Sequence, residues 1–128
     1  MAHISVTIDI AESRIADLLV SAFEGGSGYW CRIVEYVMPE ETVVIGSRPM
    51  IGEYSTLPLK KGCAVIMEVP EENDGKTYML DRTTIISGLN VMAKRFPSHW
   101  GEFLGEQDDA ETADVFLQCC LFGDVVYG

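Results

Sequence analysis

The residues best suited to recognising a ligand lie in one short stretch, residues 23–30, which reads FEGGSGYW. Its three glycines, Gly25, Gly26 and Gly28, can adopt positive φ and let another molecule approach the main chain closely. Successive exposed N–H groups in such a turn suit an anion, phosphate included. The flat rings of Tyr29 and Trp30 can stack on a base. The stretch therefore indicates a nucleotide site, although a helix C-cap followed by a loop and two core aromatic residues has the same pattern.

Two further sets of polar residues lie on predicted helices. Arg82 stands near a helix start, and Thr83, Ser87 and Asn90 follow it at helical spacing. This stripe can contact phosphates or ribose hydroxyls, and the alternative is a solvated helix face. Gln118 is a long amide on an otherwise apolar helix. Because a buried amide needs hydrogen-bond partners, Gln118 either locks the core or meets a ligand.

The sequence carries no recognisable catalytic motif. The glycine-rich stretch lacks the lysine that a P-loop needs, and no G-x-G-x-x-G is present. Serine and cysteine nucleophiles have no histidine at recognisable spacing, and His99 is the one interior candidate. We therefore expect a binding protein that is not an enzyme, with no catalytic residues and no cofactor.

Metal-ligand spacing is equally weak. An acidic group, Asp108, Asp109, Glu111 and Asp114, falls where a helix should begin, and the helix dipole favours acids there without any metal. No EF-hand spacing supports a divalent ion. Cys119 and Cys120 are neighbours that point about 100° apart on a helix, so they neither form a disulfide easily nor share a metal. We expect no metal site.

Composition places limits on the partners. The chain has 128 residues, with 9 basic and 20 acidic side chains and a net charge of −11. Such a surface repels DNA, RNA and anionic membranes, but it does not exclude a small anion held by backbone amides and one or two arginines. The four cysteines show no C-x-x-C spacing, which fits reduced, buried thiols in the cytoplasm. Neither a signal peptide nor a membrane span is recognisable.

Hydrophobic periodicity predicts one domain over residues 1–128, with an α+β fold, a mainly antiparallel sheet and helices packed on one face. Asp9 and Glu12 suggest a capping box for a first helix that Gly25 ends. Asp81, Pro97 and the pair Asp108 and Asp109 mark the starts of three later helices, and Gly123 ends the last of them. The predicted strands cover residues 3–8, 29–38, 42–45, 62–69 and 76–80, with a short edge strand near 50–54.

Three segments resemble one family of small phage and prophage proteins. They are FEGGSGYW at 23–30, YMLD at 78–81 leading to GLNVMA at 88–93, and DDAETADVFLQCCLFG at 108–123. The family is Thoeris anti-defence 1. The resemblance implies a sponge that binds glycocyclic ADP-ribose signals made by bacterial TIR-domain enzymes and holds them without cleavage. It also implies a homodimer or higher homo-oligomer in the host-cell cytoplasm, and some relatives bind cyclic oligonucleotides as well.

Together, the residues and the resemblance predict one nucleotide-binding domain. The predicted ligand-binding residues are Phe23, Gly25, Gly26, Ser27, Tyr29, Trp30, Arg82, Asn90 and Gln118. In this hypothesis the glycine-rich turn holds phosphate, an aromatic ring stacks on the base, and Arg82 or Asn90 contacts phosphate or ribose. A different class of function stays open. An acidic phage protein can instead inhibit a host protein by direct contact, since a charge of −11 speeds association with basic partners.

Overall fold

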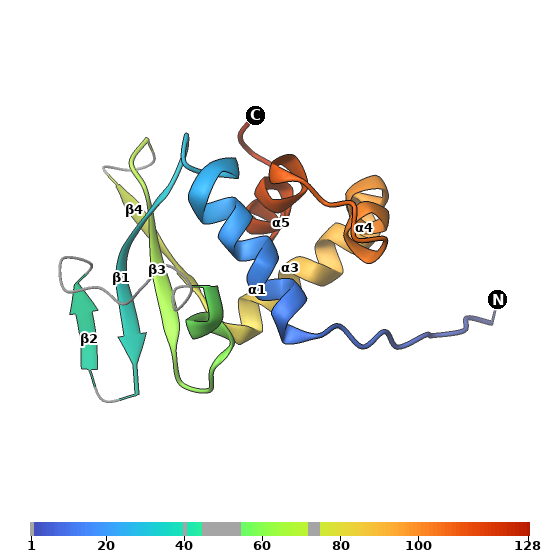
Figure 1. Cartoon of the computed structure of the whole chain (residues 1–128), viewed down its shortest axis with the longest axis horizontal. Coiled ribbons are helices and arrows are strands. Elements are labelled where there is room, and N and C mark those ends of the chain that lie inside the picture. The colour runs from blue at the N-terminus through green and yellow to red at the C-terminus, as the bar shows by residue number, and fades with distance from the viewer. Residues whose placement is uncertain (1, 40, 45–54, 72–74) are drawn as a thin grey trace.

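The chain folds into a four-stranded antiparallel sheet with helices on one face, which confirms the predicted α+β class (Figure 1). The computed structural model describes residues 2–39, 41–44, 55–71 and 75–128. The strands are β1 (Arg32–Met38), β2 (Glu41–Val44), β3 (Ala64–Val69) and β4 (Lys76–Leu80), in the order β2-β1-β3-β4. The helices are α1 (Glu12–Ser21), α3 (Arg82–Arg95), α4 (Pro97–Leu104) and α5 (Ala110–Phe122), with short turns η1 (Ala22–Gly26) and η3 (Leu57–Leu59).

The central strand β3 supplies much of the sheet's contribution to the core. Val65, Met67 and Val69 are all but inaccessible, at 0%, 1% and 0% exposure, and alternate along one face. Val65 pairs with Tyr36 of β1 on one side and Leu80 of β4 on the other. Because side chains alternate across a strand, this register places the apolar set against the helices.

Helix α5 is the innermost helix of the layer. Every residue from Thr112 to Cys120 is buried, so no face of the helix is exposed to solvent over that span. Helix α3 approaches it closely at Gly88, where a β-carbon would lie 2.8 Å from the Cys120 Cα. The glycine is therefore required for this helix crossing, since a larger side chain would overlap the α5 backbone.

Three helix boundaries follow the local signals. The Asp81 side chain accepts the Thr84 N–H in a capping box, and the Asp109 side chain accepts the Thr112 N–H. Gly123 ends α5 in the left-handed conformation, at φ 73°. The predicted capping role of Asp9 is wrong, because α1 begins after Ala11 and has no side-chain cap.

Residues 2–10 form an extended N-terminal arm whose first residues project beyond the helices (Figure 1). The prediction of a strand at residues 3–8 is therefore wrong, because the arm pairs with no strand in the part of the chain that the structure describes. Ile4 and Val6 are 93% and 81% exposed. The alternation of apolar and polar residues shows that one side of the segment is suited to burial, but it does not identify the partner that would bury it. The edge strand predicted near 50–54 lies outside the described residues.

All four cysteines are unpaired thiols buried in the core. Burial raises the pKa of Cys31 to about 12 and of Cys119 to about 11, and it raises the pKa of Cys120 well above its ordinary value. Burial therefore keeps Cys31, Cys119 and Cys120 as neutral thiols in the folded protein. Within the described residues, no helix is both long enough and apolar enough to cross a membrane.

Candidate functional site

The glycine-rich turn is packed against the protein itself. It follows α1 as the π-helical turn η1, and neither Gly25, Gly26 nor Gly28 has positive φ. A β-carbon on Gly26 would overlap the Ala110 carbonyl oxygen and lie 3.3 Å from its carbonyl carbon. The predicted phosphate cradle is therefore corrected at Gly26, because this glycine serves the close approach of the turn to α5.

A buried carboxylate, Asp114 of α5, collects the polar groups that follow the turn. Its Oδ1 accepts the Ser27 hydroxyl at 2.8 Å and the Trp30 indole N–H at 2.6 Å. Its Oδ2 accepts the Tyr29 hydroxyl at 2.6 Å. These four residues, called the Asp114 cluster below, satisfy one another, as buried polar groups must. Desolvation, followed by the bond to Asp114, raises the pKa of Tyr29 to about 12.

Trp30 does not offer its ring to a ligand. It is 3% exposed, stacks on Tyr127 at 5.4 Å between ring centroids and 11° between planes, and lies 5.3 Å from the Phe122 ring. An aromatic pair in this geometry belongs to the core. The stacking platform predicted here is therefore wrong for Trp30, while Tyr29 keeps 58% of its surface exposed.

Gln118 locks the C-terminal segment, which decides between its two predicted roles. The side chain has no exposed surface. Its Oε1 accepts the backbone N–H groups of Val126 and Tyr127 at 2.7 and 2.8 Å, and its Nε2 donates to the Tyr127 carbonyl at 3.0 Å. With these partners the amide holds the last residues of the chain against α5.

Three other predicted residues, Phe23, Arg82 and Asn90, lie in open grooves. Phe23 lines a hollow of about 340 Å³ beside Gly28 and Arg32, near the glycine-rich turn. Arg82 and Asn90, both on α3, line a second hollow of about 400 Å³. We call this second hollow the arm groove, because Val6, Ile8 and Ile10 of the arm form one of its walls. The structure thus brings Arg82 and Asn90 together and separates both from Phe23.

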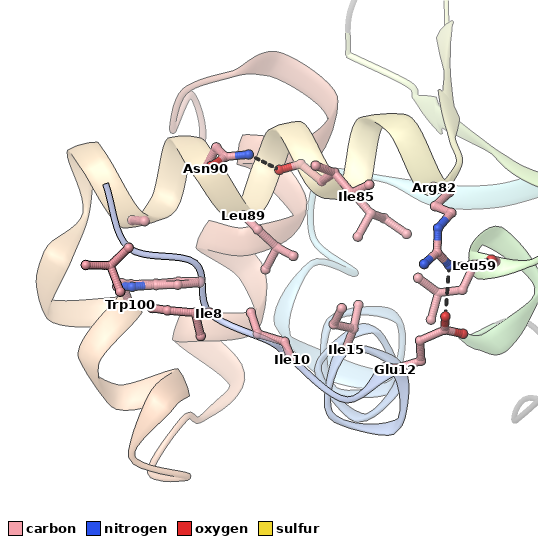
Figure 2. A pocket seen from close by; sticks show the side chains of 13 residues that line it. Ile8, Ile10, Glu12, Ile15, Leu59, Arg82, Ile85, Leu89, Asn90 and Trp100 are labelled. Atoms are coloured by element: carbon pink, nitrogen blue, oxygen red, sulfur yellow. Dashed lines mark hydrogen bonds and ion pairs between the residues drawn. The ribbon is translucent and has the colours of Figure 1, made fainter. Parts of the chain in front are cut away.

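The arm groove has a polar end and an aromatic end. Figure 2 shows Arg82 beside Glu12 at one end, Trp100 at the other, and apolar side chains between them. Arg82 Nη1 donates to Glu12 Oε2 at 2.9 Å and to the Leu59 carbonyl at 3.0 Å. Asn90 Nδ2 donates to the Ile86 carbonyl at 3.0 Å, which leaves its side-chain oxygen for other donors.

Exposure distinguishes this groove from the Asp114 cluster. The Arg82 and Glu12 side chains are 52% and 60% exposed, and an ion pair in water contributes little, so a ligand can exchange with it at small cost. Trp100 also lines the groove, and no sequence motif predicts this position. Ile8 and Ile10, which line the same groove, lie about 90 positions earlier in the chain, so local spacing does not reveal that the three residues share a groove.

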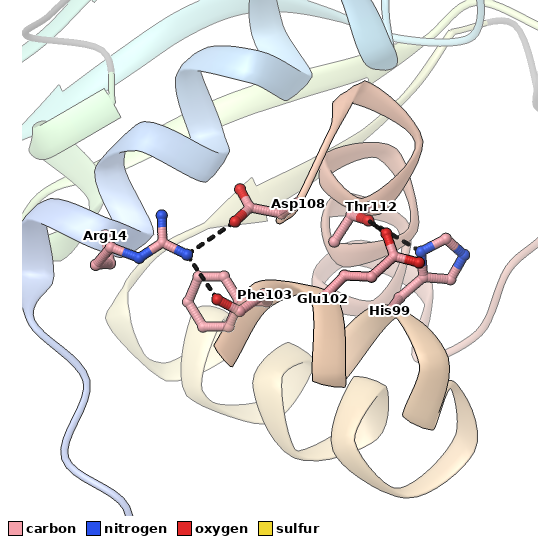
Figure 3. A network of polar contacts seen from close by, with 6 residues as sticks. All are labelled: Arg14, His99, Glu102, Phe103, Asp108 and Thr112. Atoms are coloured by element: carbon pink, nitrogen blue, oxygen red, sulfur yellow. Dashed lines mark hydrogen bonds and ion pairs between the residues drawn. The ribbon is translucent and has the colours of Figure 1, made fainter. Parts of the chain in front are cut away.

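A separate polar network joins α1, α4 and α5 (Figure 3). Arg14 Nη2 donates to Asp108 at 2.8 Å and to the Phe103 carbonyl at 2.6 Å. The Thr112 hydroxyl donates to Glu102 at 3.0 Å and lies 3.0 Å from His99 Nδ1. The set contains a hydroxyl, an imidazole and a carboxylate, but Thr112 has no exposed surface and cannot reach a substrate. The network fastens helices together.

The acidic group of the last helix is divided among structural tasks. Asp108 pairs with Arg14, Asp109 caps α5, and Asp114 accepts three donors from the turn. In the described part of the chain, no group of three or more histidines, cysteines or acids is placed to hold a metal ion.

Comparison of the chain with protein-family models, with curated proteins and with solved structures finds no match to any of them.

Proposed function

We propose that this protein is a phage anti-defence sponge that binds a cyclic nucleotide immune signal in the arm groove and holds it without cleavage. The signal class is glycocyclic ADP-ribose made by TIR-domain proteins, with cyclic oligonucleotides as a further class. The observation that supports the proposal is the placement of Arg82, Asn90 and Trp100 around one hollow of about 400 Å³. This volume lies within the range of small-molecule sites, roughly 300–1,000 Å³.

Each group has a distinct task in this proposal. The Trp100 indole stacks on the base, an interaction worth about 1–3 kcal/mol. Arg82 releases Glu12 and binds a phosphate through two N–H donors, the geometry that a guanidinium fork favours. The Asn90 carbonyl oxygen accepts a hydrogen bond from ribose or base. The apolar side chains between them exclude water from the bound ligand.

The lining favours binding over chemistry. Among the described residues around the arm groove there is no histidine, cysteine, serine or threonine, and the one carboxylate, Glu12, is paired with Arg82. A phosphodiester or glycosidic cleavage needs a positioned nucleophile or general base. We therefore propose sequestration without cleavage. From the resemblance to the phage family we also propose a homodimer or higher homo-oligomer in the host-cell cytoplasm.

Calorimetry with purified glycocyclic ADP-ribose isomers tests the proposal. We expect stoichiometric binding to the wild-type protein, and recovery of the intact ligand by mass spectrometry after the protein is denatured. Arg82→Gln should weaken binding about 10-fold or more, because a charge-assisted hydrogen bond contributes about 1.5–3 kcal/mol. No heat with any isomer or cyclic oligonucleotide would contradict the proposal, and so would a cleaved product.

Arg95→Gln is the matched control. Arg95 lies on the same helix α3, is 54% exposed and pairs with Asp124, just as Arg82 pairs with Glu12. Both variants lose one positive charge, but only Arg82 lines the arm groove. Arg95→Gln should keep the wild-type affinity within about twofold. Equal weakening by both variants would assign the effect to net charge alone.

The exposed arm favours a second candidate, inhibition of a host protein by direct contact. Ile4 and Val6 are exposed branched side chains on an extended segment, which can add to the sheet edge of another protein. Ile4→Asp separates the two functions, because Ile4 is 93% exposed and does not line the arm groove. Direct inhibition predicts a stoichiometric complex with a host protein that this variant loses, whereas the sponge predicts unchanged nucleotide binding by the variant.

A further inference from the structure

A third groove gathers positive charge in an otherwise acidic molecule. It has a volume of about 730 Å³ and is lined by Lys60, Lys61 and Arg82, so it holds three of the chain's nine basic residues. We call it the lysine groove. It shares Glu12, Leu59 and Arg82 with the arm groove, so the two hollows adjoin.

Local backbone structure brings the three cations together. Lys60 ends η3, and its N–H donates to the Leu57 carbonyl at 3.0 Å, while Cys63 N–H donates to the Lys60 carbonyl at 3.1 Å. This tight turn, completed by Gly62 at φ 77°, presents both lysine side chains to solvent. Arg82 donates to the Leu59 carbonyl, directly before Lys60, and therefore lies against the segment that carries the lysines.

The charges of the two lysines are available to a ligand. Of the four ion pairs in the described part of the chain, none includes Lys60 or Lys61. The acids that face the groove are Glu12, which pairs with Arg82, and Asp81, which caps α3. Three positive charges against two negative ones, both engaged, leave the groove locally cationic. The first turn of α3, with Thr83 on the lining, adds the positive end of a helix dipole.

The distance over which these charges act favours a small ligand over a large one. At physiological salt, electrostatic interactions fade over about 8 Å. A small anion in the lysine groove therefore meets mainly the three cations, whereas a nucleic acid or an anionic membrane also meets the surrounding surface of a protein with charge −11. Adjacent lysines are point charges, and together with an arginine fork they suit two linked phosphate groups.

We propose that Lys60, Lys61 and Arg82 form a subsite for the diphosphate of a small ligand. Its coupling to a base in the arm groove depends on the proposed function, because the shared Arg82 then lies between the base and the phosphates. This arrangement selects a nucleotide with at least two linked phosphates as the ligand class. Trp100 holds the base in this arrangement, and the lysines hold the far end of the diphosphate.

Inorganic pyrophosphate is the probe that tests the subsite. We expect it to bind the wild-type protein and to shift the backbone amide NMR signals of residues 60–63 and of the first turn of α3. The double variant Lys60→Gln, Lys61→Gln should weaken binding about 10-fold or more, since two charge-assisted contacts are lost. The control, Lys76→Gln with Lys94→Gln, removes the same two charges elsewhere and should change affinity less than about twofold.

Three results would overturn the subsite: no pyrophosphate binding by the wild-type protein, equal weakening in the control, or binding of citrate as tight as that of pyrophosphate. The proposed function fails separately. If pyrophosphate binds at the lysines while no cyclic nucleotide binds, the subsite stands and the sponge does not. If a cyclic nucleotide binds the Lys60→Gln, Lys61→Gln variant with unchanged affinity, the sponge stands and the subsite does not.

Discussion

The Asp114 cluster and the arm groove contain similar chemistry but differ in what that chemistry is bonded to. Each combines an aromatic ring, hydrogen-bonding groups and a charged residue. In the cluster, Ser27, Tyr29 and Trp30 all donate to one buried carboxylate. In the groove, Arg82 holds an exposed partner that a ligand can replace. Residue type therefore does not identify a binding site, and the decisive property is whether a polar group has a buried partner or an exposed partner that a ligand can replace.

The two tryptophans give the strongest test of this comparison. Trp30→Ala removes a buried ring and a donor to Asp114, so it should lower the free energy of unfolding by about 5 kcal/mol, the upper end for such truncations. Trp100→Ala should leave the fold intact but weaken nucleotide binding at least about fivefold. Urea unfolding and calorimetry measure the two effects. A folded Trp30→Ala variant with lost binding and normal stability would reverse the assignment.

Removal of the central carboxylate tests the cluster directly. Asp114→Ala leaves the buried Ser27 hydroxyl and Trp30 N–H without an acceptor, at about 1–3 kcal/mol each, so we expect a loss of about 4 kcal/mol. Asp114→Asn keeps one carbonyl oxygen and should cost clearly less. Denaturant midpoints compare the two. Equal, small losses would show that the cluster adds little to stability.

The glycine-rich turn offers a smaller, matched comparison. Gly26→Ala should destabilise the protein by about 2 kcal/mol, because its β-carbon overlaps the Ala110 carbonyl and the turn must shift away from α5. Gly25→Ala has nothing within 4 Å of the new atom and should be neutral or stabilising by up to about 1 kcal/mol. Thermal unfolding of both variants measures the difference. Loss of ligand capture by a stable Gly25→Ala variant would return the site to the turn.

The smallest expected effect is a pH dependence from Tyr29. Its pKa is raised from 10.0 to about 12 in the folded protein, so folding favours the neutral phenol. The contribution to stability is complete below pH 10 and disappears as the pH rises through 12. Unfolding free energies measured from pH 9 to 12 should fall less steeply in Tyr29→Phe than in the wild type. Identical slopes would contradict the raised pKa of Tyr29 in the folded protein.

Local signals in the sequence predict most of the secondary structure. Asp81 and Asp109 accept hydrogen bonds from their helix starts, and Gly123 ends α5 at positive φ, as their positions suggest. Strand β4 occupies the predicted residues 76–80. These features depend on neighbours within a few positions, so the chain's own spacing specifies them.

The site was harder to predict because its determinants are distant in sequence. Trp30 bonds to Asp114, which lies 84 positions further along the chain, and no local pattern reveals that bond. Arg82 and Asn90 were predicted together from one helix face, and they do line one groove. Trp100 joins them only through the packing of α4 and the arm around α3. The glycines and aromatic rings of residues 23–30 make contacts within the fold, and a ligand site would contain the same residue types.

The reactivity of the four buried thiols can be used to measure unfolding of the protein. A thiolate is the species that alkylating reagents attack, and burial raises the pKa of Cys31, Cys119 and Cys120 as well as blocking access. Labelling of these cysteines therefore requires the core to open. Its rate, followed by mass spectrometry, reads the population of opened molecules without any added probe. A bound ligand that stabilises the folded state should slow that labelling in proportion to its occupancy.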